Sequence, residues 1–178
     1  MTVLSQQAVY AVRRTRLPDC QFLAAIERSA AALFVSDPTL AWLAQQDPID
    51  TSKHAELIGS GLCFVAVSGD DPPCGFIATE VLGSDLHIWE LSVESSHQQR
   101  GIGRQLIVAA ERAAACSGLQ RLTLTTFRDL AWNGPFYQSC GFAESPDAAP
   151  DPRLAALLDA EAKHGLSAER RFAMIKLL

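Results

Sequence analysis

Hydrophobic positions follow two different periods along the chain, and their alternation predicts a mixed α/β protein. Short stretches rich in apolar and β-branched residues predict strands at residues 9–14, 63–67, 75–82, 86–93, 122–127 and 171–177. Apolar residues spaced three or four apart predict helices at residues 19–33, 103–117 and 152–163, with shorter helices inside residues 36–53 and at residues 133–139. The order of these segments then decides how the strands can pair.

Turn sequences and connection lengths predict that pairing. Glycine-containing turns at residues 68–71 and 83–85 predict that three successive strands form an antiparallel meander. A helix between the last of these strands and the strand at 122–127 predicts a crossover and a locally parallel pair. The expected fold class is therefore α/β (α+β mixed), with a mostly antiparallel central sheet and helices on both faces. We expect a single domain over residues 1–178, in which residues 144–178 supply the C-terminal helix and the last strand.

The charge balance limits the possible binding partners, and the cysteine content indicates the cellular compartment. Fifteen Lys and Arg against 20 Asp and Glu give a net charge of -5, whereas a broad nucleic-acid-binding surface needs a basic face. The five cysteines are odd in number and lack metal-ligand spacing, so we expect free buried thiols and neither a disulfide framework nor a metal site. No leader pattern is visible, and the apolar runs are too short to span a membrane. We therefore expect a cytoplasmic protein with no nucleic-acid or membrane partner.

One glycine-containing segment carries the clearest chemical signal. Residues 98–104 read Gln-Gln-Arg-Gly-Ile-Gly-Arg and lie between a predicted strand and a predicted helix. The glycines let the backbone approach a ligand, and the helix N-terminus offers N–H groups and the positive end of its dipole, so the segment suits a pyrophosphate. The P-loop motif is excluded because Gly-Lys-Ser/Thr is absent. A dinucleotide fingerprint is excluded because Leu106 stands at its third glycine and Thr123 stands where an acidic residue is needed.

Two further blocks frame this loop. Leu-Ser-Val at residues 91–93 precedes the Gln-x-x-Gly-x-Gly run of residues 98–103, and Phe-Tyr-Gln-Ser-Cys-Gly-Phe at residues 136–142 follows it. In this order and spacing, the chain resembles the GNAT superfamily of N-acetyltransferases, and the resemblance covers most of its length. It implies acetyl-CoA as a cosubstrate without a metal. It also implies that the strands at 86–93 and 122–127 splay apart, so that the pantetheine arm fills the gap between them.

The same resemblance implies a set of cofactor-binding residues. Backbone groups of residues 91–93 would pair with the pantetheine arm, and the amides of residues 99–104 would hold the pyrophosphate. The full set is Leu91, Ser92, Val93, Gln98, Gln99, Arg100, Gly101, Ile102, Gly103, Arg104 and Asn133. Many relatives have an asparagine seven residues before the tyrosine, where this chain has Leu130. Asn133 is therefore open between a cofactor contact and a helix cap, and we favour the cap.

Catalysis would need a base for the acceptor amine and an acid for the departing thiolate. Glu90 is the candidate base because it interrupts an apolar strand just before residues 91–93, although an edge-facing or salt-bridged carboxylate stays open. Tyr137 is the candidate acid, since the family's tyrosine commonly lies beside the thioester sulfur, and packing is the alternative. We expect His87 to have a surface or structural role. We expect Glu27 to lie on a solvated helix face rather than toward the acceptor.

These residues lead to one hypothesis for the function and two alternatives. We expect an N-acetyltransferase that transfers an acetyl group from acetyl-CoA to a primary amine by direct attack in a ternary complex. The acceptor is a small molecule or a peptide. The alternatives are a non-catalytic acyl-CoA-binding sensor with the same fold and an interaction protein with a fortuitous glycine turn. The identity of the acceptor, the acyl chain length and the choice between monomer and homodimer do not follow from the sequence.

Overall fold

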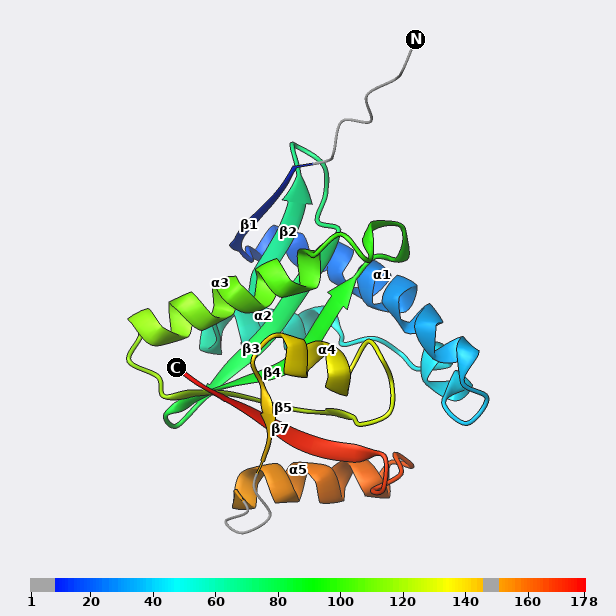
Figure 1. Cartoon of the computed structure of the whole chain (residues 1–178). Helices are drawn as coiled ribbons and strands as arrows, with labels where there is room; N and C mark the ends of the chain where they lie inside the picture. The colour runs from blue at the N-terminus through cyan, green and yellow to red at the C-terminus, as the bar shows by residue number, and fades with distance from the viewer. Residues whose placement is uncertain (1–8, 146–150) are drawn as a thin grey trace. The chain divides into compact units, whose positions relative to one another are not determined.

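The computed structural model of the protein describes residues 9–145 and 151–178 (Figure 1). Within these residues, seven strands form one sheet. The strands are β1 (Tyr10–Arg14), β2 (Phe64–Ser68), β3 (Gly75–Leu82), β4 (Asp85–Val93), β5 (Arg121–Phe127), β6 (Ala143–Glu144) and β7 (Arg171–Leu177). Their order in the sheet is β1-β2-β3-β4-β5-β7-β6. β4 and β5 are parallel, whereas β1–β2, β2–β3, β5–β7 and β6–β7 are antiparallel. The predicted mixed and mostly antiparallel sheet is therefore confirmed.

In the part of the chain that the structure describes, five α-helices and four 3-10 turns accompany these strands. The α-helices are α1 (Cys20–Ala31), α2 (Thr51–Ser60), α3 (Ile102–Cys116), α4 (Gly134–Ser139) and α5 (Pro152–Lys163). The 3-10 turns are η1 (Leu17–Asp19), η2 (Ala32–Ser36), η3 (Ala41–Gln45) and η4 (Ser95–His97). Four of the five α-helices lie where the pattern predicts them. No described helix is long and apolar enough to cross a membrane.

The helix α2 was not predicted, although the chain carries a signal for its start. Asp50 precedes it, and its carboxylate accepts a hydrogen bond from the backbone amide of Lys53 at 2.8 Å, which is an N-cap. His54 and Leu57 form its buried face. The prediction of one short helix inside residues 36–53 describes η3 but overlooks the second helix that begins at Thr51.

The chain divides into two compact units. Residues 1–79 and 90–110 make the first unit, and residues 80–89 and 111–178 make the second. β3, β4 and α3 each contribute residues to both units. The expectation of a single domain over the whole chain stays a prediction.

In the first unit, helices cover both faces of the sheet. α1 and α2 pack on one face, over a core of Leu23, Ile26, Leu57, Cys63, Val65, Val67, Phe76 and Ala78. The neighbouring residue on β3, Gly75, points to the opposite face. A Cβ atom on Gly75 would lie 3.3 Å from the Ile102 side chain and 3.2 Å from the Ser92 carbonyl oxygen. The start of α3 therefore packs closely on that second face.

The second unit repeats this arrangement around β5. Thr125 Oγ1 donates to Glu161 on α5 at 2.6 Å, whereas the next residue, Thr126, donates to Asn133 at the start of α4 at 2.6 Å. Consecutive residues of a strand point to opposite faces, so α4 and α5 lie on opposite faces of β5. Helices on both faces are thus found in each unit.

The predicted parallel pair is also present, and it is short. Its register joins Asp85 to Arg121 and His87 to Thr123. Within the second unit β4 continues to Trp89 and β5 to Phe127, yet these later residues extend the ladder no further among the described residues. Hydrogen bonding between the two strands therefore ends shortly after it begins.

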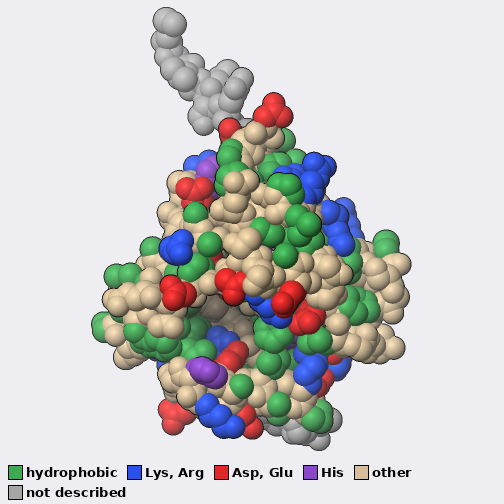
Figure 2. Space-filling view, turned by 180° about the vertical axis from the view of Figure 1, so that it is seen from behind, with side chains coloured by type: hydrophobic (Ala, Val, Ile, Leu, Met, Phe, Trp, Pro, Cys, Tyr) green, Lys and Arg blue, Asp and Glu red, His purple; other side chains and the backbone are tan. Residues whose placement is uncertain are grey.

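Basic and acidic side chains are interspersed on the face of the molecule shown in Figure 2. Arg128 and Glu144 form an exposed ion pair, with 2.7 Å between the guanidinium nitrogen and the carboxylate oxygen. The cysteines Cys20, Cys63, Cys74, Cys116 and Cys140 are free thiols. Four of them are buried as expected, but Cys116 at the end of α3 is exposed, so that part of the prediction is wrong.

Candidate active site

The glycine-containing loop of the first unit leads directly into α3. Gln99 and Gly101 both adopt left-handed backbone conformations, with φ values of 60° and 78°. The first backbone hydrogen bond at the start of α3 runs from Gln105 N to the Gly101 carbonyl, at 3.1 Å. Among the described residues, the amides of residues 99–103 donate to no backbone carbonyl. A series of N–H groups therefore precedes a helix of four turns, which is the arrangement that binds an anion.

Hydrogen bonds from the side chains of Gln98 and Arg100 hold this loop in place. Gln98 Nε2 donates to the Val93 carbonyl at 3.0 Å. Arg100 donates to the Tyr10 hydroxyl at 2.9 Å and to the Ser96 carbonyl at 3.1 Å. Arg100 is exposed, but these two hydrogen bonds hold its guanidinium in place.

Sequence reasoning missed one side chain that supports the loop. Tyr10 on β1 lies 87 residues before His97, yet its hydroxyl is 3.0 Å from His97 Nδ1 and also accepts the bond from Arg100. Its ring packs edge-on against the His97 ring, with centroids 5.8 Å apart. No local motif connects these positions, so no signal in the sequence could have found the contact.

Glu90 lies half-buried on β4, on the same face as Ser92 two residues later. Ser92 Oγ donates to Glu90 Oε1 at 2.6 Å. Ser92 itself is 3% exposed, so this hydrogen bond forms away from bulk solvent. A hydrogen bond donated to a carboxylate stabilises its charged form.

The negative charge of Glu90 on β4 acts on the carboxylate of Glu27 on α1. Both oxygens of Glu27 accept from the Ile49 amide, at 3.3 and 3.2 Å. Burial and then the negative charge of Glu90 raise the pKa of Glu27 to about 7, against the lowering effects of the Ile49 amide and Arg28. Glu27 is half-buried, so the expectation of a solvated helix face is wrong. The influence of Glu90 on Glu27 depends on the tertiary packing of α1 and β4, which no local pattern in the sequence indicates.

In the second unit, His87 is fully buried and has a structural role. Its Nδ1 lies 2.9 Å from Thr123 Oγ1. Burial, followed by the charge of Arg153, lowers its pKa to about 4, so the ring is neutral at physiological pH. The adjacent Asp85 is 3% exposed. It accepts from Arg121 at 2.8 and 2.6 Å and from Arg153 at 2.8 Å.

Asn133 and Tyr137 also belong to the second unit. Asn133 stands at the N-cap position of α4, but its side chain makes no capping hydrogen bond and instead accepts from Thr126. The predicted capping role of the side chain is therefore wrong, although the position is right. Tyr137 packs edge-to-face with Phe136 and Phe142, with ring centroids 5.2 and 5.6 Å apart. This packing is the alternative that the sequence left open, and the acid role stays a prediction.

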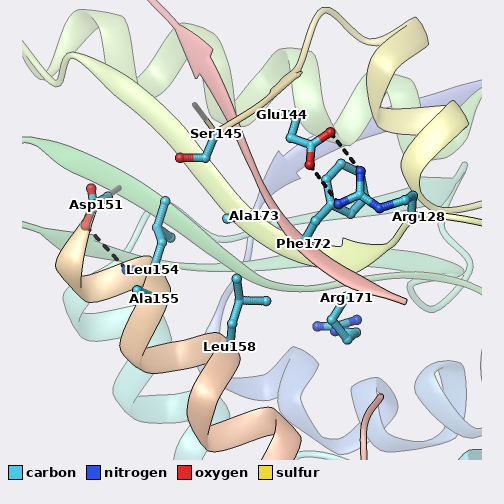
Figure 3. Close-up of a pocket in the computed structure, with 10 residues that line it drawn as sticks. All are labelled: Arg128, Glu144, Ser145, Asp151, Leu154, Ala155, Leu158, Arg171, Phe172 and Ala173. Atoms are coloured by element: carbon cyan, nitrogen blue, oxygen red, sulfur yellow. Dashed lines mark hydrogen bonds and ion pairs between the residues drawn. The ribbon is translucent and has the colours of Figure 1, made fainter. Parts of the chain in front are cut away.

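A cavity of about 170 Å³ lies in the second unit, beside α5 (Figure 3). It is lined by Arg128, Glu144, Ser145, Asp151, Leu154, Ala155, Leu158, Arg171, Phe172 and Ala173. The charged side chains at its wall are already bonded, since Arg128 pairs with Glu144, Arg171 with Glu161 and Asp151 with Arg121. None of the residues expected at the site lines it. In the part of the chain that the structure describes, no group of three or more His, Cys, Asp or Glu side chains could hold a metal ion.

Comparison with known proteins agrees with this geometry. Residues 59–144 match a family model described as an acetyltransferase (GNAT) domain. Over 95 residues the chain is 27% identical to the uncharacterised N-acetyltransferase YvbK of Bacillus subtilis, a match that covers 52% of this chain and 61% of that protein. The match thus spans about three fifths of that relative's length.

Solved structures share the fold at low sequence identity. The PaiA N-acetyltransferase of Thermoplasma acidophilum, in complex with coenzyme A, has a TM-score of 0.70 and 16% identity, with 96% of this chain and 99% of that chain covered. The ribosomal-protein-S18-alanine N-acetyltransferase of Escherichia coli has a TM-score of 0.65 and 16% identity, with coverages of 95% and 94%. Residues 59–144 therefore match a GNAT acetyltransferase domain, and the solved acetyltransferases share the fold of the chain.

Proposed function

We propose that the protein is an acetyl-CoA-dependent N-acetyltransferase that acetylates a primary amine by direct attack in a ternary complex. The observation that carries the proposal is the loop at residues 98–104, whose amides precede α3 and donate to no described backbone carbonyl over residues 99–103. Such amides can bind a diphosphate without a metal. A cytoplasmic location, where free thiols persist, is part of the same proposal.

Two parts of acetyl-CoA, the pyrophosphate and the pantetheine arm, have proposed partners in the first unit. The amides of residues 99–104 hold the pyrophosphate, and the backbone of residues 91–93 pairs with the pantetheine arm. Gln98 supports this arrangement, because its side chain bonds the carbonyl of Val93 and so ties the loop to the end of β4. The thioester supplies an activated acetyl group. Asn133 is a further proposed contact in the second unit.

The transfer requires two proton movements. A free alkylamine has a pKa of about 10, so the acceptor binds as an ammonium and must lose a proton before it can attack. Glu90 takes that proton, the amine nitrogen bonds the carbonyl carbon, and the C–S bond breaks. Tyr137 donates its hydroxyl proton to the departing thiolate and recovers a proton from solvent. Holding both reactants together makes a covalent enzyme intermediate unnecessary.

The acceptor is proposed only as an amine of a small molecule or a peptide. The neighbour of similar fold from Escherichia coli is named for an alanine of a ribosomal protein. At 16% identity that likeness shows a shared fold and does not identify the acceptor. A screen for the acceptor therefore includes peptide N-termini, amino acids and polyamines.

The test is release of free thiol from acetyl-CoA in the presence of an amine panel, combined with calorimetric binding of coenzyme A. We expect turnover with at least one amine. Gly101→Glu should weaken coenzyme A binding by about 100-fold or more, because it places a negative charge beside the diphosphate and strains a left-handed residue. Gly69→Glu is the matched control, since Gly69 has a φ of 58° and equally open surroundings in the same unit.

Three outcomes separate the alternatives. Equal binding by the Gly101→Glu and Gly69→Glu variants would contradict the phosphate loop. Tight binding without turnover on any amine would favour a sensor instead of an enzyme. Tyr137→Phe should lower kcat by about 100-fold with unchanged affinity for coenzyme A, and wild-type kcat across the pH range would remove Tyr137 as the acid.

A further inference from the structure

We propose that Tyr10 on β1 is a positioning residue for coenzyme A, because its hydroxyl holds the loop at residues 98–104 in the conformation that binds the diphosphate. This inference rests on the proposed function and adds to it a residue of the first strand. Tyr10 lies outside residues 59–144, which match the acetyltransferase domain. Tyr10 and the loop both belong to the first unit.

The loop contains one residue whose backbone conformation is unfavourable for its type. Gln99 has a φ of 60°, and residues other than glycine rarely adopt this region because the Cβ atom crowds the backbone. Such a conformation persists where the surrounding contacts fix it. The side chains on either side of Gln99 are fixed in this way, since Gln98 bonds a carbonyl of β4 and Arg100 bonds Tyr10. Tyr10 is therefore one of the contacts that maintain the loop conformation.

The Tyr10 hydroxyl joins two residues of this segment. Its oxygen accepts from Arg100 at 2.9 Å and lies 3.0 Å from His97 Nδ1. A tyrosine hydroxyl has one proton to donate, and with Arg100 as the donor on one side, His97 Nδ1 is placed to accept that proton on the other. The second ring nitrogen, Nε2, lies 3.9 Å from a carboxylate oxygen of Glu94. A proton on Nε2 leaves Nδ1 as an acceptor, so one hydroxyl can connect both residues.

The residues just before the loop are fixed by other parts of the first unit. The Ser95 amide donates to Ser29 Oγ on α1 at 3.0 Å. The Glu94 amide donates to the Cys74 carbonyl, next to the start of β3, at 2.9 Å. Tyr10 itself is paired with β2 in the sheet. The loop is thus held in shape by the sheet and by α1, and a loop that is ordered before its ligand arrives loses less conformational entropy on binding.

Backbone dynamics of the protein without coenzyme A test this role independently of activity. Tyr10→Phe removes the hydroxyl and keeps the ring that packs edge-on against His97. We expect the ¹⁵N order parameters of residues 99–101 to fall in this variant. Unchanged order parameters at residues 99–101 would overturn the inference.

Ser52→Ala is the matched control for Tyr10→Phe. It also removes one hydroxyl, which donates to Asp50 at 2.6 Å, and it leaves the net charge unchanged. Ser52 lies on α2, which packs on the face of the sheet opposite to the start of α3. We expect the order parameters of residues 99–101 in this variant to equal those of the wild type.

Binding and kinetics separate positioning of the cosubstrate from a general structural role. We expect Tyr10→Phe to weaken coenzyme A binding about tenfold by calorimetry. The KM for acetyl-CoA should rise by a similar factor while kcat changes by less than about twofold, because the reacting groups are untouched. Ser52→Ala should bind coenzyme A like the wild type. Equal affinity of the two variants for coenzyme A would contradict the proposal.

A double-mutant cycle tests whether Tyr10 acts through Arg100. In an Arg100→Gln background the bond to the Tyr10 hydroxyl is already lost, so Tyr10→Phe should weaken coenzyme A binding by only about threefold or less. A full tenfold loss in that background would overturn the proposed route. Failure of the wild type to bind coenzyme A would instead overturn the proposed function and leave the order parameters standing.

Discussion

Buried ionisable groups occur in both units, and the two units accommodate them in opposite ways. In the first unit, burial and then the negative charge of Glu90 raise the pKa of Glu27 to about 7. In the second unit, Asp85 is bonded by two arginines, and burial keeps the adjacent His87 neutral with a pKa of about 4. Two negative charges therefore repel each other in the first unit. In the second unit, Arg121 and Arg153 compensate the negative charge of the buried Asp85.

The two arrangements suit different roles, one in stabilising the fold and one in catalysis. A buried carboxylate bonded by two guanidinium groups fixes the position of α5 against β4 and β5, since Arg153 lies on α5 and Arg121 on β5. Such an ion pair is satisfied and has no free capacity for reaction. A like-charge pair has no structural benefit of this kind, and perturbed carboxylates of that type are typical of functional sites.

The largest expected effect is at the compensated region. Asp85→Ala leaves Arg121 and Arg153 without their buried partner and should lower the free energy of unfolding by about 3–5 kcal/mol. Glu144→Ala is the control, since it breaks the exposed pair with Arg128 and should cost about 1 kcal/mol or less. Urea unfolding at pH 7 measures both. If the two variants lose similar stability, Asp85 is not the structural anchor of this region.

A smaller effect is expected from the titration of His87. Its folded-state pKa of about 4 lies below the ordinary value of 6.5, so protons bind the unfolded chain more readily and stability falls as pH decreases from about 6.5 toward 4. This loss amounts to about 2 kcal/mol at pH 5. His87→Gln keeps a polar side chain without titrating, so the stability difference from the wild type should shrink from pH 7 to pH 5. An identical pH dependence in both proteins would contradict a buried neutral His87.

The smallest effect is expected at the like-charge region and has the opposite sign. The folded-state pKa of Glu27 is raised from 4.5 to about 7, so its contribution to stability is present below pH 4.5 and is lost as pH rises through 7. Glu27→Gln should therefore be more stable than the wild type at pH 8.5 by about 1 kcal/mol, or about 2–4 °C in Tm. Near pH 4, where Glu27 is protonated in the folded protein and largely protonated in the unfolded chain, the two should melt together. Glu56→Gln, which changes an exposed carboxylate on α2, should show no such difference, and a Tm gain that is independent of pH would point to packing rather than to charge.

Much of the fold could be predicted because its elements are encoded locally. β3, β4, β5 and α3 each carry a recognisable pattern of apolar residues between clear turns, and the structure places them within about two residues of the prediction. α2 was missed because its ten residues include few apolar positions and follow a proline-rich stretch. β6 has only two residues, which is too short for any periodic pattern to register.

The candidate site was predictable only where its residues are contiguous. The loop at residues 98–104 is a single run in the sequence, so its glycines and the following helix could be recognised together. The contact of Tyr10 with Arg100 spans 90 residues, and the Ile49 amide reaches Glu27 across 22. Such contacts depend on tertiary packing, and for that reason the sequence favoured a solvated Glu27 and a capping Asn133, both of which the structure corrects.

The proposed function depends on the amides at the start of α3, which would bind the diphosphate of coenzyme A. ¹H–¹⁵N NMR of the protein titrated with coenzyme A observes these amides one by one. We expect the amide resonances of residues 99–104 to shift strongly and saturably, while the amide resonance of Gly69 in the β2–β3 turn stays in place. Saturable binding that leaves residues 99–104 unperturbed would contradict the proposed function.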